Sequence, residues 1–189
     1  VVMILGDGYL GQMAEPCVLP EEVKDLPAKP WALTGKTKDR DSHIIASLKL
    51  GGDDTKLNKH VKSLAENYAE IAKNEVQYEN FMCDDADFVL CAYGTSARVC
   101  KKAVKVLREQ GIKAGLFRPI TLWPFPENEL EAACANAKKV LTVEMSLGQM
   151  VQDVRMYSGK KKADLDFYGE PGGVIPKLDV IVEKVKSYV

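Results

Sequence analysis

The chain has 189 residues, of which 46% are hydrophobic and 28% charged, and this composition is typical of a globular protein long enough to bury a full core. Its 26 basic and 27 acidic residues nearly cancel, and no block of like charge stands out, so the sequence favours neither a nucleic-acid partner nor a membrane surface. No apolar stretch approaches the length of a membrane span and no signal-peptide pattern is present, so we expect a cytoplasmic protein.

The cysteines and histidines give no pattern of metal ligands. The five cysteines form no C-x-x-C pair, and four of them lie in apolar or helical patterns typical of buried free thiols. The two histidines, His43 and His60, are not at ligand spacing. We therefore expect a reducing compartment and no zinc or iron–sulfur site within this chain.

Residues 1–15 are predicted to form a strand, a Gly-rich turn and the start of a helix. The apolar run 1–5 resembles a buried strand and begins without an initiating Met, so we expect a piece of a longer polypeptide, cut before the last strand of an upstream domain. Gly6-Asp7-Gly8 is the pattern with which many thiamine diphosphate enzymes begin their diphosphate and Mg²⁺ site. Such a site also needs an Asn at a set distance downstream of the Asp. Residues 31–38, "WALTGKTK", lie at that distance and contain no Asn. We therefore interpret the two glycines as permitting a sharp turn.

Residues 16–54 are predicted to be a long connecting segment, because prolines, glycines and the polar run "TGKTKDRDSH" prevent a sustained helix. Trp31 is interpreted as an anchor against a neighbouring domain or subunit. A helix capped by Asp54 or Thr55 follows. Its apolar residues form one narrow stripe at helical spacing: Leu57, Val61, Leu64, Tyr68 and Ile71. This helix either docks on its own domain or bridges two domains.

The last hundred residues alternate between strand and helix patterns. Strands are predicted at about 87–93, 112–118, 139–145 and 164–169, and helices at 96–111, 126–137, 147–158 and 177–189. Gly111 should end the first of these helices and Pro126 should begin the second. This alternation predicts an α/β fold with an open, mostly parallel sheet and helices on both faces.

In such sheets, ligands bind beyond the carboxyl ends of the strands, where helix N-termini converge. After the first strand, "YGTS" contains Gly94 for a tight turn and Thr95 or Ser96 as a helix cap. It is either a phosphate or carboxylate cradle or simply a good N-cap, and we favour the N-cap.

Two other strands also end in residues that suit binding. Arg118, held by Pro119, suits an anion or an inter-subunit carboxylate, and the following "WPF" (residues 123–125) suits an apolar contact. Glu144 is a plausible polar contact beside Gly148 and Gln149. The chain has no nucleophile elbow, P-loop or dinucleotide fingerprint, so these patterns indicate only an α/β domain with a preceding arm.

Six segments together resemble one family. They are "GDGYLGQMAEP", "PWALTG", "NEVQYE", "AYGTSARVCKKAVKVLREQGIKAGLFRPITLWPFP", "VEMSLGQMVQDV" and "FYGEPGGVIP". In this order they are similar to the C-terminal half of the alpha subunit of 2-oxoacid:ferredoxin oxidoreductases. The run 92–126 is the most specific. Within the family the chain is most similar to the 2-ketoisovalerate (3-methyl-2-oxobutanoate) type, because "TGKTKDRDSH" replaces the acidic stretch usual in the 2-oxoglutarate type.

The resemblance implies a thiamine diphosphate-dependent oxidative decarboxylation in which a 2-oxoacid and coenzyme A give an acyl-CoA, with electrons passing through iron–sulfur clusters to ferredoxin. In that family the domain N-terminal to this piece holds the cofactor's pyrimidine ring, a different subunit holds the diphosphate and Mg²⁺, and another holds the clusters. The chain alone would then bind no cofactor and be inactive without the other subunits of the complex.

The resemblance also implies a domain organisation. Residues 1–15 would be the tail of the pyrimidine-binding domain, 16–83 a linker with a connecting helix, and 84–189 a transketolase C-terminal-like α/β domain. No catalytic residue is transferred to this chain. We expect Gly94, Thr95, Ser96 and Arg118 at an interface or anion-contacting edge near the active site, and residues 7–12 at the rim of the pyrimidine domain.

Two other hypotheses remain open. The first is a non-catalytic module of flavodoxin-like type that binds a small ligand or anion through "YGTS". The second is a pure assembly domain, which differs from the enzyme-subunit hypothesis only in whether Arg118 or Glu144 faces substrate.

Overall fold

The computed structural model describes residues 2–42, 55–158 and 164–189. Two compact units are present: Val1–Met13 together with Ala69–Val189 form one, and Ala14–Tyr68 form the other. In the second unit, the described residues 14–42 contain turns and a single bridge between Thr37 and Arg40 but no regular helix or strand. The predicted connecting segment agrees with this over residues 16–42, and the rest of it, 43–54, lies outside the described residues. Trp31 is exposed.

Helix α1 (Thr55–Asn74) confirms the helix predicted after the connecting segment. It begins at Thr55, and the alternative cap, Asp54, lies outside the described residues. No residue of α1 is buried, and Leu57, Val61, Tyr68 and Ile71 of the predicted stripe are 38–53% exposed. The predicted apolar stripe is therefore partly exposed in the described structure.

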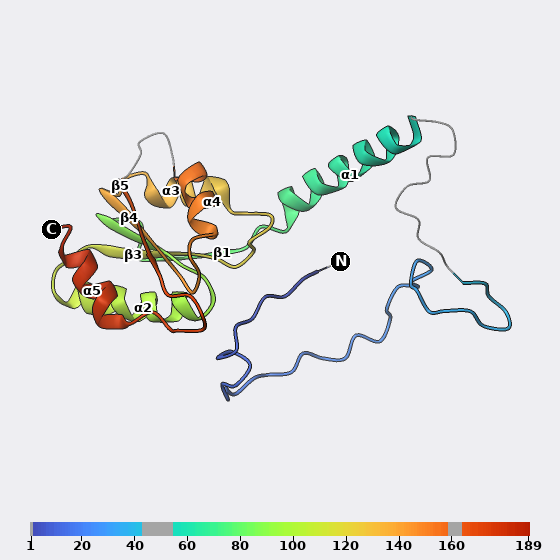
Figure 1. The fold of residues 1–189 in the computed structure, drawn as a ribbon, viewed down its shortest axis with the longest axis horizontal. Coiled ribbons are helices and arrows are strands. Elements are labelled where there is room, and N and C mark those ends of the chain that lie inside the picture. The colour runs from blue at the N-terminus through green and yellow to red at the C-terminus, as the bar shows by residue number, and fades with distance from the viewer. Residues whose placement is uncertain (1, 43–54, 159–163) are drawn as a thin grey trace. The chain divides into compact units, whose positions relative to one another are not determined.

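The first unit is built on a five-stranded sheet with the strand order β1-β3-β2-β4-β5 (Figure 1). The strands are β1 (Tyr78–Phe81), β2 (Phe88–Cys91), β3 (Ala114–Pro119), β4 (Lys139–Glu144) and β5 (Asp164–Gly169). Strands β2 to β5 pair in parallel, whereas β1 pairs antiparallel with β3. The predicted open, mostly parallel sheet is confirmed.

Helices cover both faces of the sheet, as the alternating pattern predicted (Figure 1). Helices α2 (Gly94–Glu109) and α5 (Leu178–Lys186) lie on one face, and α3 (Glu127–Cys134) and α4 (Met150–Tyr157) lie on the other. Successive strand residues point to opposite faces. Leu90, Leu116 and Leu141 therefore pack in the α2/α5 core, and Val89, Phe117 and Val140 pack in the α3/α4 core.

Two helix ends lie close to their sequence signals, whereas α3 and α5 end three residues earlier than predicted and α4 begins three residues later. Helix α2 ends at Glu109, and Gly111 takes a left-handed φ of 80° just beyond it, as predicted. Pro126 stands one position before the predicted one, as the N-cap of α3.

Two predictions near the N-terminal end of the unit need correction. Residues 2–5 are exposed and form no strand, because a strand needs a partner and none of the described residues pairs with them. Residues 8–12 form a turn, closed by hydrogen bonds from the Gln12 and Met13 amides to the Tyr9 carbonyl, but no helix follows. Pro16 disfavours helical geometry in the residue before it and has no amide hydrogen to donate.

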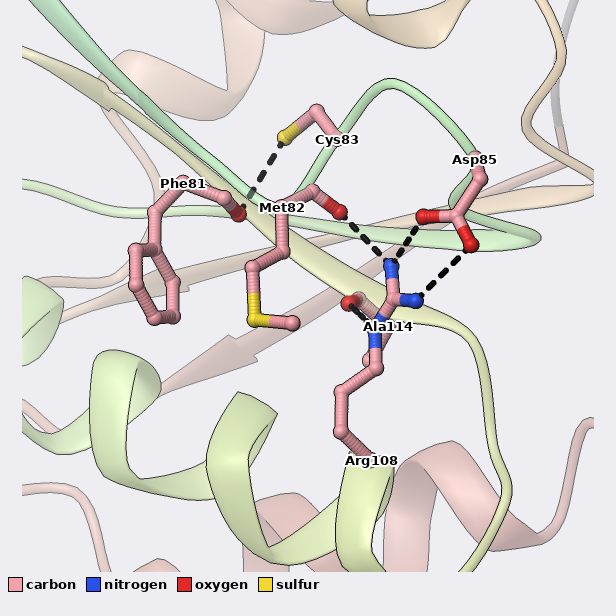
Figure 2. Close-up of polar contacts among 6 residues, drawn as sticks. All are labelled: Phe81, Met82, Cys83, Asp85, Arg108 and Ala114. Atoms are coloured by element: carbon pink, nitrogen blue, oxygen red, sulfur yellow. Dashed lines mark hydrogen bonds and ion pairs between the residues drawn. The ribbon is translucent and has the colours of Figure 1, made fainter.

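Strand β1 was not predicted from the sequence, and it lies within the segment 16–83 interpreted as a linker. The turn from β1 to β2 is tightly held (Figure 2). Met82 has a positive φ of 57°, and Arg108 of α2 donates to the Met82 carbonyl. Gly115 permits the close approach of this turn to β3, because a Cβ there would lie 2.7 Å from the Met82 oxygen.

Candidate functional site

The predicted site centres on the N-terminus of α2, beyond the carboxyl end of β2. Helix α2 begins at Gly94, which has a φ of 56°, and its N-cap is Tyr93, which makes no side-chain capping hydrogen bond. The prediction that Thr95 or Ser96 caps this helix is therefore wrong. The helix starts two residues earlier than predicted, at Gly94, and so places both hydroxyls within its first turn, where they are buried.

The anion at this helix N-terminus is supplied by the chain itself. The Thr95 hydroxyl donates a hydrogen bond of 2.7 Å to Oδ2 of Asp7. The other oxygen of Asp7, Oδ1, accepts hydrogen bonds from the amides of Tyr9 (2.9 Å) and Leu10 (3.0 Å). The Thr95 hydroxyl, followed by these amides, holds the pKa of Asp7 below its usual value. A negative charge is stabilised there by the helix dipole as well.

This arrangement does not suit a cation. The groups around Asp7 are O–H and N–H donors, which are partners of an anion, whereas Mg²⁺ requires oxygen ligands with free lone pairs. Among the described residues, no group of three or more His, Cys, Asp or Glu side chains could hold a metal ion. Asp7 thus acts as an internal anion, and the Gly-Asp-Gly turn gives its side chain this position.

A pocket lies beside the Asp7–Thr95 pair, with a volume of about 290 Å³. Its lining comes from three places in the sequence: residues 5–7 with Leu10, residues 93–96, and Met145 after β4. Gly94, Thr95 and Ser96 thus line a pocket at this edge of the sheet. That they contact an interface or an external anion stays a prediction.

Arg118 does not join them. It lies on β3 and donates a hydrogen bond of 3.1 Å to Glu79 of β1, which also pairs with Lys101 of α2. Hydrogen bonds first from Lys101 and then from Arg118 lower the pKa of Glu79, against the opposing effect of its burial. The predicted partner of Arg118 was an anion or a carboxylate of another subunit; the partner in the structure is instead Glu79 of the same chain, on the strand that was not predicted. The buried Nε of Arg118 has no hydrogen-bond partner in the described structure.

Glu144 is the third predicted polar position; the contacts that the structure shows for it are with the chain's own amides and the Ser146 hydroxyl. The side chain is only 1% exposed at the end of β4. Its carboxylate accepts hydrogen bonds from the amides of Gln149 (3.1 Å), Met150 (3.0 Å) and Val151 (2.9 Å), and from the Ser146 hydroxyl (3.0 Å). Because these amides open α4, Glu144 is the N-terminal anion of that helix.

The charge of Glu144 acts on its surroundings. Burial, and then the Glu144 carboxylate, raises the pKa of Tyr93 and likewise that of Asp153. Glu144 is therefore a fixed, buried acceptor whose hydrogen bonds organise the loop between β4 and α4. Its orientation toward these amides gives it a structural function in this chain.

The pairing of Asp7 with Thr95 was missed from the sequence, although one signal points to it. "DGYLGQM" (residues 7–13) and "EMSLGQM" (residues 144–150) share an acidic residue followed three positions later by Leu-Gly-Gln-Met. The second copy places its carboxylate at a helix N-terminus, so the first copy suggests the same function for Asp7. Sequence alone does not indicate which helix Asp7 reaches.

The sheet topology and the contacts at the carboxyl ends of its strands define an open α/β domain. In this domain, helices α2 and α4 each begin beside a carboxylate of the chain itself. Residues 86–181, about half of the chain, match the family described as pyruvate:ferredoxin oxidoreductase core domain II. The chain belongs to this family, in agreement with the resemblance noted from the sequence.

Individual relatives agree with this assignment. The chain is 40% identical over 187 residues, 98% of its length and 52% of the relative's, to the ketoisovalerate oxidoreductase subunit VorB of Methanothermobacter thermautotrophicus. It is 30% identical, over 97% of its length and 55% of the relative's, to the 2-oxoglutarate synthase subunit KorA of Methanothermobacter marburgensis. The chain thus spans about half the length of these relatives.

A solved structure supports the fold. It is the 2-oxoglutarate:ferredoxin oxidoreductase from Magnetococcus marinus with 2-oxoglutarate, coenzyme A and succinyl-CoA bound. The match has a TM-score of 0.52 and 26% identity, and it covers 59% of this chain and 19% of that one.

In the described residues of the present chain, no helix is long and apolar enough to cross a membrane.

Proposed function

We propose that this chain is part of the alpha-type subunit of a thiamine diphosphate-dependent 2-oxoacid:ferredoxin oxidoreductase that acts on a branched-chain 2-oxoacid. One observation carries the substrate class. The two ketoisovalerate oxidoreductase relatives are 40% and 41% identical over 98% of the chain, whereas the 2-oxoglutarate synthase relatives are 28–35% identical.

Within this proposal, residues 1–15 are the tail of a pyrimidine-binding domain, 16–83 connect it to the α/β domain and contribute strand β1 to the sheet, and 84–189 form the rest of the α/β domain. The chain supports assembly, and thiamine diphosphate, Mg²⁺ and iron–sulfur clusters are held elsewhere in the complex. The donor groups around Asp7 support this division, because they suit an anion and not the Mg²⁺ of a diphosphate site. Coenzyme A and ferredoxin are partners of the whole complex.

The substrate is tested with the complete complex that contains this chain. Reduction of ferredoxin is followed with 3-methyl-2-oxobutanoate, 2-oxoglutarate or pyruvate, each with and without coenzyme A. We expect kcat/KM to be at least about tenfold higher for the branched-chain acid, a ratio that differences in one pocket can supply. Preference for 2-oxoglutarate or pyruvate, or turnover that does not require coenzyme A, would contradict the proposal.

The proposal that thiamine diphosphate and Mg²⁺ are bound elsewhere in the complex has its own test. Isothermal titration of the 189-residue chain with thiamine diphosphate and Mg²⁺ should show no binding. Micromolar affinity would place the cofactor site on this chain.

An independent anion-binding module is the weaker hypothesis, because Asp7 already occupies the α2 N-terminus that "YGTS" would offer to a ligand. Inorganic phosphate should therefore leave the amide NMR signals of Gly94 and Thr95 unchanged. Saturable shifts at these two residues would favour the module.

A further inference from the structure

The two acidic-x-x-Leu-Gly-Gln-Met segments use their carboxylates differently. Glu144 turns back onto the amides of its own segment and of the helix that follows it. Asp7 uses only Oδ1 for its own turn, which leaves Oδ2 to accept from Thr95, 88 positions away in the sequence. The first segment is thereby joined to a distant helix rather than to one of its own.

A second contact joins the same segment to α2. Arg98, one turn beyond Gly94, has its Nη1 at 3.9 Å from the sulfur of Met13. Asp7 and Met13 thus both reach the first turns of α2, and the pocket beside them is shared by residues 5–7 and 93–96. Segment 7–13 thus contacts α2 at both of its ends.

The residues just before this segment are unusually exposed for their type. Val2, Met3, Ile4 and Leu5 are 63–91% exposed and lie outside any helix or strand of the described structure. Four consecutive apolar residues rich in β-branched side chains are suited to pair as a strand with another sheet. The relatives carry about half of their length outside the part that this chain spans, so a partner sheet within the same subunit has room to exist.

We infer that Asp7 is a positioning residue: by binding Thr95, it holds segment 7–13 on α2 and so presents residues 2–5 as a strand to the sheet of a second domain of the same subunit. This inference rests on the proposed function for the existence of that second domain. The hydrogen bond to Thr95 itself belongs to the chain as described.

The experiment measures amide hydrogen exchange in peptides covering residues 2–13, in the complete protein that contains this chain. Thr95→Val removes the donor hydroxyl, and Thr95→Ser retains it as the matched control. Exchange of residues 2–13 should become about tenfold faster in Thr95→Val, as expected for the loss of one charge-assisted hydrogen bond, and stay at the wild-type rate in Thr95→Ser. Peptides from α5 serve as an internal reference for global unfolding.

Asp7→Asn completes the test, because the interaction predicts that the two changes are not additive. The double variant Asp7→Asn/Thr95→Val should exchange no faster than the faster of its two parents. Equal exchange in wild type and Thr95→Val, additive effects, or unprotected residues 2–5 in the wild-type protein would each overturn the inference. Exchange is measured without turnover, so a failure of the 2-oxoacid assay would contradict the proposed function and leave this result to be judged separately.

Discussion

The guanidinium of Arg108 donates two hydrogen bonds to the carboxylate of Asp85, at 2.7 and 3.0 Å (Figure 2). The same group donates to the carbonyls of Met82 (2.7 Å) and Ala114 (2.6 Å). One side chain of α2 therefore fixes the turn between β1 and β2 and the start of β3. Arg108 is largely buried and Asp85 is exposed. Water can therefore replace Arg108 as a hydrogen-bond donor to the carboxylate more readily than to the two carbonyls.

Replacing Arg108 with Ala should lower the free energy of unfolding by about 2 kcal/mol, because two carbonyls near the protein interior lose their charged donor. Urea unfolding followed by circular dichroism measures the change. Asp85→Asn is the matched control, since it keeps the bonds from Arg108 to both carbonyls and should change the stability little. Equal losses in the two variants would show that the ion pair, and not the turn, carries the effect.

The buried acceptor Glu144 gives a second prediction. Glu144→Gln puts an amide NH₂ group opposite backbone N–H donors, so the amides that open α4 can no longer all be satisfied. We expect a loss of about 2–4 kcal/mol in unfolding free energy, the cost of burying unpaired polar groups. Exchange of the Met150 and Val151 amides should quicken as well. The exposed Glu131→Gln in α3 should affect neither measurement, and wild-type stability in Glu144→Gln would contradict this account of the loop.

Glu79 predicts a dependence of stability on pH. Its pKa in the folded protein lies below the ordinary value of 4.5, chiefly through Lys101 and then Arg118. A carboxyl whose pKa is lowered by folding stabilises the protein above its unfolded pKa, and this contribution is lost as the pH falls through the folded value. Stability should therefore decline below about pH 4.5, and Glu79→Gln should reduce the slope of that decline.

Unfolding midpoints in urea between pH 3 and pH 7 measure this slope. The exposed Glu109→Gln, on the same helix as Lys101, serves as the control and should keep the wild-type slope. An unchanged slope in Glu79→Gln would mean that the pair with Lys101 and Arg118 does not persist in solution.

The parts of the structure that sequence predicts best are those whose signals are local. Periodicity places α2 and β4, and Gly111 marks the end of α2, because each of these signals depends on neighbouring residues. Strand β1 has only four residues and alternates weakly, and its hydrogen bonds come from β3, so nothing local identifies it.

The same difference between local signals and long-range contacts applies to the candidate site. Glu144 is recognisable because its partners follow it within seven positions, whereas Asp7 and Thr95 are 88 positions apart. Arg118 was predicted to suit an anion or a carboxylate of another subunit, but its partner is Glu79 of the same chain, which the pairing of β1 with β3 places beside it. Residues 2–5 have a strand pattern without a strand partner in the described structure, so a pattern of side chains alone could not determine their conformation.

The cysteines provide a last prediction, on accessibility. Cys83, Cys91, Cys100 and Cys134 are buried, and burial raises the pKa of each thiol, to about 12 for Cys83 and Cys134. Cys17 is exposed. A thiol reacts as its thiolate and only when reagent reaches it, so the folded 189-residue chain should release one equivalent of chromophore quickly from an aromatic disulfide reagent at pH 8. The other four thiols should react only after denaturant is added. Cys17→Ser should abolish the fast phase and leave the total at four, and a second fast-reacting thiol would show that one of the two cores opens in the native state.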